Sequence, residues 1–224
     1  MTIESYYYRD MGIKLTIKQK KVLELIYDSL NTSGFPPTLA DLKEKLGVAS
    51  NQSVLNFLNT LEKKEYIKRS EDRQARGIKI LPFGYREIGK DPLIKMAGIS
   101  AGGSYVESFA DAFTFLPIAE KVLENEKINE SKDEVFVIQV SGDSMINAGI
   151  EDGDMLLIKK SKEYKNNDIV IARTENGTTV KKFIADGGKR YLQPENPAYE
   201  RMIIIPGEVQ FQGKVILNLS KINK

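Results

Sequence analysis

The stretch Val140-Ser141-Gly142-Asp143-Ser144-Met145, followed later by Val180-Lys181-Lys182, decides between the fold classes open to this chain. Ser144 comes after an apolar strand pattern and a glycine that lets the backbone turn sharply, which would expose the serine hydroxyl. A serine becomes a nucleophile when a neighbouring base takes its proton, and the chain contains no histidine. A lysine can be that base if loss of hydration lowers its pKa. The two segments therefore predict a serine–lysine pair in a β-rich domain.

Strand periodicity does not decide which lysine is the base. In an extended strand Lys181 lies on one face, with Thr179, and Lys182 lies on the other face. Either lysine has apolar neighbours, and a lysine at a strand edge commonly extends its ammonium group to solvent. Both assignments stay open on the residues alone.

The nucleophile segment has other interpretations. Gly142-Asp143-Ser144 is also typical of a plain polar turn. If Ser144 is a nucleophile, nearby backbone N–H groups are candidates to face an oxyanion, Met145 among them. Asp152 and Asp154 lack the spacing of a calcium loop, so we interpret them as turn residues and expect no metal.

Composition narrows the class of protein. The chain has 224 residues, enough for two modest cores, and it has no cysteine, which excludes disulfides and thiol catalysis. The longest apolar runs are too short to cross a bilayer and no signal peptide precedes them, so we expect a cytoplasmic protein. Residues 1–80 carry 14 Lys and Arg against 10 Asp and Glu, a net +4 that is compatible with a polyanion partner.

The first third of the chain predicts three helices and a hairpin. Thr16 with Gln19 has the form of a capping box, and Thr38 with Asp41 begins a second helix that ends at Gly47. Ser50 caps a third helix after a tight turn. Two short strands, at 66–69 and 77–81, complete the pattern. The arrangement is typical of a winged helix-turn-helix, and a plain helical bundle is the alternative.

The third helix and the hairpin carry the candidate DNA contacts. Amide side chains pair with adenine edges in the major groove, and basic side chains contact phosphates. The predicted DNA-binding residues are Ser50, Asn51, Gln52, Ser53, Asn56, Arg69 and Arg76. The partner we expect is double-stranded DNA.

The remaining chain predicts a second, mostly β domain. Residues 82–92 lose periodicity and are interpreted as a linker. Strands are expected at 135–140, 155–159, 168–173, 179–184 and 209–217. The fold class is thus α+β with two domains, a DNA-binding domain over 1–81 and a second domain over 93–224.

Several of these motifs resemble LexA-type repressors. The nucleophile segment and Gly149-Ile150-Glu151-Asp152-Gly153-Asp154 are similar to the family's serine segment, and Thr179-Val180-Lys181 to its general-base segment. Ala101-Gly102, within a run of small residues, occupies the place of the family's scissile bond. The likeness starts at about Gly12, so we interpret residues 1–11 as an extension, with Met11 as an alternative start.

The resemblance implies a function and partners. It implies a homodimeric repressor of DNA-damage (SOS) genes that cuts itself between Ala101 and Gly102, with Ser144 as nucleophile and Lys181 as base, and without a cofactor. A RecA-type filament on single-stranded DNA would stimulate the cut. The alternative is a phage-type repressor of the same fold that regulates prophage or mobile-element genes. The residues on the third helix do not determine which operator sequence the protein binds.

Overall fold

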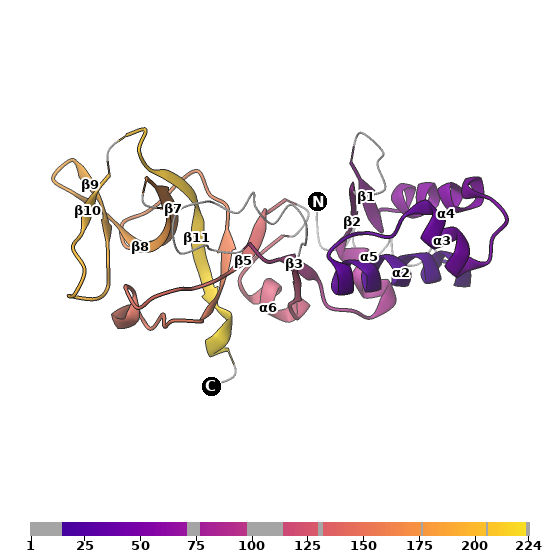
Figure 1. The fold of residues 1–224 in the computed structure, drawn as a ribbon, viewed down its shortest axis with the longest axis horizontal. Coiled ribbons are helices and arrows are strands. Elements are labelled where there is room, and N and C mark those ends of the chain that lie inside the picture. Colours follow the sequence, from indigo (N-terminus) through magenta and orange to yellow (C-terminus); the bar gives the residue numbers. More distant parts are fainter. Residues whose placement is uncertain are drawn as a thin grey trace. The chain divides into compact units, whose positions relative to one another are not determined.

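The computed structural model describes residues 15–70, 77–97, 114–129, 132–175, 177–204 and 206–222. The chain divides into two compact units, Met1–Leu93 and Ile94–Lys224. The first unit is mostly helical and the second is mostly β, as Figure 1 shows. No helix among these described residues is long and apolar enough to span a membrane.

The three predicted helices are present, and side-chain caps begin each of them. Helix α2 (Ile17–Ser33) starts at Thr16, whose hydroxyl accepts from Gln19 N while the Gln19 side chain accepts from Thr16 N. Thr38 and Asp41 make the same reciprocal pair at the start of α3 (Leu39–Leu46). Helix α4 (Asn51–Lys63) starts at Ser50, which accepts from Ser53 N. Each cap satisfies backbone donors that the first turn leaves unpaired.

A two-stranded hairpin packs with these helices. Strands β1 (Ile67–Arg69) and β2 (Ile78–Ile80) are antiparallel, with Ile67 opposite Ile80. Both isoleucines are buried, together with the apolar faces of the helices: Val22, Leu23, Ile26, Leu42, Val54, Leu58 and Leu61. The winged helix-turn-helix prediction is confirmed.

The linker prediction is wrong for residues 82–88, which form helix α5 (Pro82–Ile88). Pro82 suits the first helical turn, which needs no N–H from that position. Tyr85 is buried and its ring meets Tyr27 of α2 edge-on, with 6.2 Å between the centroids. Gly84 lies so close to the chain that an added Cβ would be 2.5 Å from Tyr66 O. The helix therefore belongs to the first unit. Its contacts with Tyr27 and Tyr66 stabilise it, although its sequence lacks the apolar periodicity of a helix.

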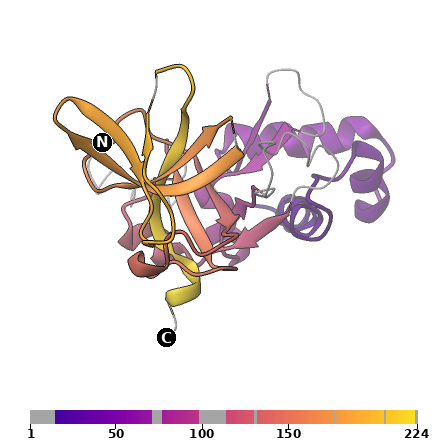
Figure 2. The same ribbon diagram turned by 60° about the vertical axis from the view of Figure 1, so that its left-hand side comes forward.

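The second unit contains a seven-stranded antiparallel sheet in the order β10-β9-β8-β7-β11-β6-β5. Figure 2 shows how strongly its strands twist. Their bounds are β5 Val135–Gln139, β6 Met155–Lys159, β7 Ile169–Thr174, β8 Gly177–Asp186, β9 Lys189–Gln193, β10 Met202–Ile203 and β11 Gln210–Asn218. The smaller elements are β3 Leu93–Lys95, β4 Phe115–Pro117, α6 Glu120–Asn125, and the 3-10 turns η2 Ile146–Ala148 and η3 Leu219–Lys221. The mostly-β prediction is confirmed.

A core cluster lies beside the nucleophile segment. Met145, which directly follows Ser144, is 1% exposed and packs with Ile138 of β5, Leu156 of β6 and Val180 of β8. Burial of each of these side chains stabilises the folded state by about 1.5–3 kcal/mol relative to leaving it exposed to solvent. The core therefore fixes the residues next to Ser144 and next to Lys181 at once.

Candidate functional site

The nucleophile turn, residues 141–145, begins where β5 ends. Val140 N donates to Asp154 O at 2.8 Å and Gly153 N donates to Val140 O at 3.0 Å, so the turn leaves the sheet at a fixed point. Gly142 has φ +93°, a conformation that side chains disfavour, and its N–H donates to Asp152 Oδ1 at 2.7 Å. The glycine therefore produces the sharp turn that the sequence predicted.

Lys181 on β8 lies against this turn. Its Nζ is 2.7 Å from Ser144 Oγ, 2.7 Å from Thr179 Oγ1 and 3.1 Å from Val180 O. A neutral amine has two N–H bonds and one lone pair. The Thr179 hydroxyl and the Val180 carbonyl can accept the two N–H bonds, which turns the lone pair to the Ser144 hydroxyl. The geometry is that of a base ready to take a proton from serine.

The environment of Lys181 favours the neutral amine. Burial removes water from the ammonium group and lowers the pKa of Lys181 from 10.5 to about 8. With a pKa of about 8, about a tenth of the lysine is neutral near pH 7, against roughly one part in three thousand for a free lysine. The amine is thus available as a base close to neutral pH.

Lys182 is directed elsewhere. Its Nζ is 2.7 Å from Glu195 Oε1, and about a quarter of each side chain is exposed. The structure therefore places Lys181 beside Ser144 and pairs Lys182 with an acid, a choice that strand periodicity left open.

The structure describes the predicted oxyanion residue, Met145, but not the predicted scissile bond. Met145 has a buried side chain, and its carbonyl accepts from Ala148 N and Ile150 N, which fixes the peptide plane that follows it. Its role as an oxyanion donor remains a prediction. Ala101 and Gly102 lie outside the described residues.

Among the described residues no group of acidic or other ligating side chains is arranged to hold a metal ion.

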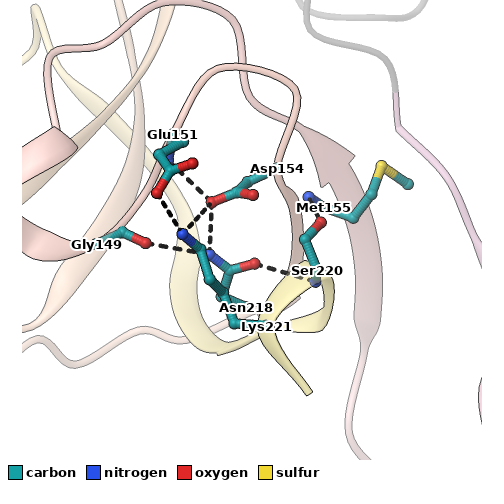
Figure 3. Close-up of polar contacts among 7 residues, drawn as sticks. All are labelled: Gly149, Glu151, Asp154, Met155, Asn218, Ser220 and Lys221. Atoms are coloured by element: carbon teal, nitrogen blue, oxygen red, sulfur yellow. Dashed lines mark hydrogen bonds and ion pairs between the residues drawn. The ribbon is translucent and has the colours of Figure 1, made fainter. Parts of the chain in front are cut away.

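The acidic turn that supports Gly142 is itself fixed by the end of β11, as Figure 3 shows. Asp154 is 8% exposed, and its Oδ2 accepts from Asn218 Nδ2 at 2.7 Å and from Glu151 N at 2.9 Å. Lys221 pairs with Glu151 at 2.6 Å, and Ser220 Oγ accepts from Met155 N at 2.9 Å. Residues 149–155 are thereby tied to the end of β11 and to η3, in keeping with the interpretation of Asp152 and Asp154 as turn residues.

We expect Asn218→Ala to destabilise the second unit. The change removes a donor from a nearly buried carboxylate, which typically costs about 1–3 kcal/mol. Thermal unfolding followed by a signal from the β unit measures the loss. Ser161→Ala, which removes a hydroxyl that bonds only within its own exposed loop, is the control. Equal melting temperatures for both variants would contradict the importance of the Asp154–Asn218 bond.

Helix α4 presents the predicted DNA-binding amides to solvent. Asn51, Gln52 and Asn56 are exposed, and Gln52 Nε2 donates to Asn56 Oδ1 at 3.1 Å. That bond holds the two amides side by side on an exposed part of the helix. The hydroxyls of Ser50 and Ser53 lie 3.1 Å apart at the helix start, where Ser50 serves as the cap.

Arg69 does not fit the predicted phosphate contact. Its guanidinium donates to Glu62 Oε2 at 2.8 and 2.5 Å and to Asn59 Oδ1 at 2.6 Å, and the side chain is 10% exposed. A guanidinium neutralised by a carboxylate is a poor partner for phosphate, so Arg69 instead joins β1 to α4. The neighbouring strand positions Lys68 and Lys79 are exposed and lie opposite each other. Arg76 lies outside the described residues.

Fold and site together define a class. A winged helix-turn-helix followed by a β unit with a serine–lysine pair is the architecture of a DNA-binding protein that carries a peptidase domain. Comparison with known proteins makes the class specific. Residues 13–77 match the model of the LexA DNA binding domain, and residues 92–216 match the Peptidase S24-like model.

Full-length relatives agree with both matches. The chain is 35% identical over 205 residues to the LexA repressor of Geobacter sp. (strain M21), covering 91% of this chain and 96% of the relative. It is 33% identical to the LexA repressor of Limosilactobacillus fermentum, covering 90% of this chain and 94% of that protein. It is 34% identical to the LexA repressor of Geobacillus thermodenitrificans, covering 91% of this chain and 96% of that protein. The chain belongs to the LexA repressor family.

Proposed function

We propose that this protein represses DNA-damage (SOS) genes and inactivates itself by cutting the bond between Ala101 and Gly102. Ser144 is the nucleophile and Lys181 the general base. The observation that carries the proposal is the 2.7 Å contact between Lys181 Nζ and Ser144 Oγ, made by a lysine whose pKa burial lowers to about 8. Family membership supplies the link to repression.

The chemistry proceeds in two steps. Ser144 Oγ attacks the carbonyl carbon of Ala101 while its proton passes to the neutral Lys181 amine. The carbon–nitrogen bond then breaks, Lys181 returns the proton to the Gly102 nitrogen, and an ester links Ala101 to Ser144. Water, deprotonated by Lys181, hydrolyses that ester and restores the serine. Backbone N–H groups of the turn, with Met145 as the candidate, would stabilise the negative oxygen.

Cleavage would end repression by separating the two units. A dimer holds two winged helices on adjacent half-sites, and the coupling raises their effective concentration on the operator. A cut at Ala101 severs each DNA-binding unit from the dimerising unit, so avidity is lost although each DNA contact survives. A RecA-type filament on single-stranded DNA would accelerate the cut by increasing the population in which the scissile segment occupies the site.

Fragment masses test the proposal directly. We expect purified protein incubated at alkaline pH to yield two fragments, residues 1–101 and 102–224, identified by intact mass spectrometry. Intact protein after long incubation, or fragments from another bond, would contradict the assignment. Added RecA-type filament is expected to produce the same fragments faster near neutral pH.

We expect the α4 amides to read bases. Gln52→Ala or Asn56→Ala is expected to weaken operator binding by roughly 1–3 kcal/mol with little change on random DNA. Lys68→Ala is expected to weaken both kinds of binding alike and to reduce the salt dependence, as a phosphate contact does. Fluorescence anisotropy at several salt concentrations separates these outcomes. Equal losses on operator and random DNA for the amide variants would place base readout on another element.

A further inference from the structure

The loop of residues 194–199, which follows β9, lies directly against the nucleophile turn. Glu195 N donates to Ser144 O at 2.9 Å, and Asn147 N donates to Glu195 O at 2.9 Å. Backbone bonds to one loop residue therefore hold the nucleophile itself and the residue three positions after it. These bonds need no particular side chain at position 195.

Two side chains of the same loop hold Asp143, the residue before the nucleophile. Asn196 Nδ2 donates to Asp143 O at 3.1 Å and lies 3.3 Å from Asp143 Oδ2. The Tyr199 hydroxyl donates to Asp143 Oδ1 at 2.5 Å. The hydrogen bond to this carboxylate, together with its charge, raises the pKa of Tyr199, so the phenol remains a donor into the alkaline range where lysine-based cleavage is fastest.

The loop is also joined to the strand of the base. Lys182 lies opposite Gln193 in the β8–β9 register, and Gln193 directly precedes the loop. The Lys182 ammonium then pairs with the Glu195 carboxylate at 2.7 Å. The loop thus contacts Lys182, which is next to the base, and it also contacts Asp143, Ser144 and Asn147 of the nucleophile segment.

The sheet order explains why such a connection matters. Ser144 follows β5, whereas Lys181 lies on β8, and β7, β11 and β6 separate the two strands in the sheet. On the β5 side the turn is held by Asp152, which accepts from Gly142 N, and by Asp154, which accepts from Val140 N and from Asn218 of β11. Packing of Met145 against Val180 brings the two segments together in the core, and the loop adds polar contacts that fix the orientation of the turn around Ser144.

We propose that residues 194–199 are a positioning clamp that holds the nucleophile turn against the base strand through Glu195, Asn196 and Tyr199. The proposal rests on the proposed function of Ser144 and Lys181. Reacting groups displaced by about 1 Å can lose roughly a hundredfold in rate. The clamp residues touch no reacting atom, so they act through the placement of Ser144.

Clamp variants of the full-length protein test this. We expect Tyr199→Phe combined with Asn196→Ala to lower the cleavage rate at the alkaline plateau by roughly tenfold to a hundredfold. Glu195→Gln, which keeps both backbone bonds, is expected to lower it by less. The pH midpoint of cleavage should not move, because the burial of Lys181 is unchanged. Tyr199 is 45% exposed, so we expect the loss of its hydroxyl to leave the fold intact, which the thermal unfolding of the variant checks.

Matched controls come from the same unit. Tyr164→Phe removes a phenol hydrogen bond of 2.7 Å, and Asp133→Asn weakens an ion pair of 2.8 Å with Lys159. Both are expected to cleave at the wild-type rate. The clamp proposal is wrong if the clamp variants also cleave at the wild-type rate. It is also wrong if they shift the pH midpoint and leave the plateau rate intact. Either result leaves the proposed function standing. A wild-type protein that never cuts itself would overturn the proposed function with it.

Discussion

Replacing Lys181 by arginine is expected to abolish self-cleavage and leave operator binding intact. Arginine keeps a long cationic side chain but does not lose its proton in proteins, so it offers no lone pair to the Ser144 hydroxyl. Ser144→Ala removes the nucleophile with little change of volume and is expected to have the same effect. The two residues act as a unit, so either loss should cost roughly a thousandfold or more in rate. The first-order rate of fragment appearance measures both.

Lys182→Ala is the matched control for Lys181→Arg. Lys182 is adjacent in sequence, but it pairs with Glu195 and not with Ser144. We expect it to retain cleavage within roughly tenfold of the wild-type rate, a loss no larger than a positioning contact supplies. If Lys182 proved essential and Lys181 dispensable, the assignment of the base would be wrong.

The second large effect is the dependence of cleavage on pH. Lys181 accepts a proton only when it is neutral, and its folded pKa is lowered to about 8. The cleavage rate therefore rises with pH, because protonation below that pKa removes the base and deprotonation above it supplies the base. Cleavage is expected to rise about tenfold for each pH unit below about pH 8 and to level off above it. Activity that declines as the pH rises would contradict a lysine base.

Local chemistry made much of the fold predictable. Thr16 and Thr38 mark helix starts because a hydroxyl at that position satisfies a free backbone N–H, and that interaction spans only four consecutive residues. The principal strands were predictable because apolar residues dominate them and turn residues bound them. Helix α5 was not predictable in this way, since it depends on Tyr27 and Tyr66, which lie far away in the sequence.

The site was predictable as a set of residue types, but not as a geometry. The sequence suggested a serine and a lysine, whereas the choice between Lys181 and Lys182 depends on how β8 meets the nucleophile turn in space. The pairing of Arg69 with Glu62 depends in the same way on the packing of β1 against α4. Residues 194–199 carried no signal beyond a polar turn, because every contact that the loop makes with the nucleophile turn spans about 50 residues of sequence.

The most direct test of the central claim is whether each molecule cuts its own chain. Wild-type protein is mixed with an excess of Ser144→Ala protein that carries a distinguishable tag, and both are followed at about pH 9, where Lys181 is mostly neutral. A cut within one chain predicts that the wild-type protein is cleaved at a rate independent of total protein concentration, while the tagged variant remains intact. Cleavage of the tagged variant, or a rate proportional to protein concentration, would contradict the account.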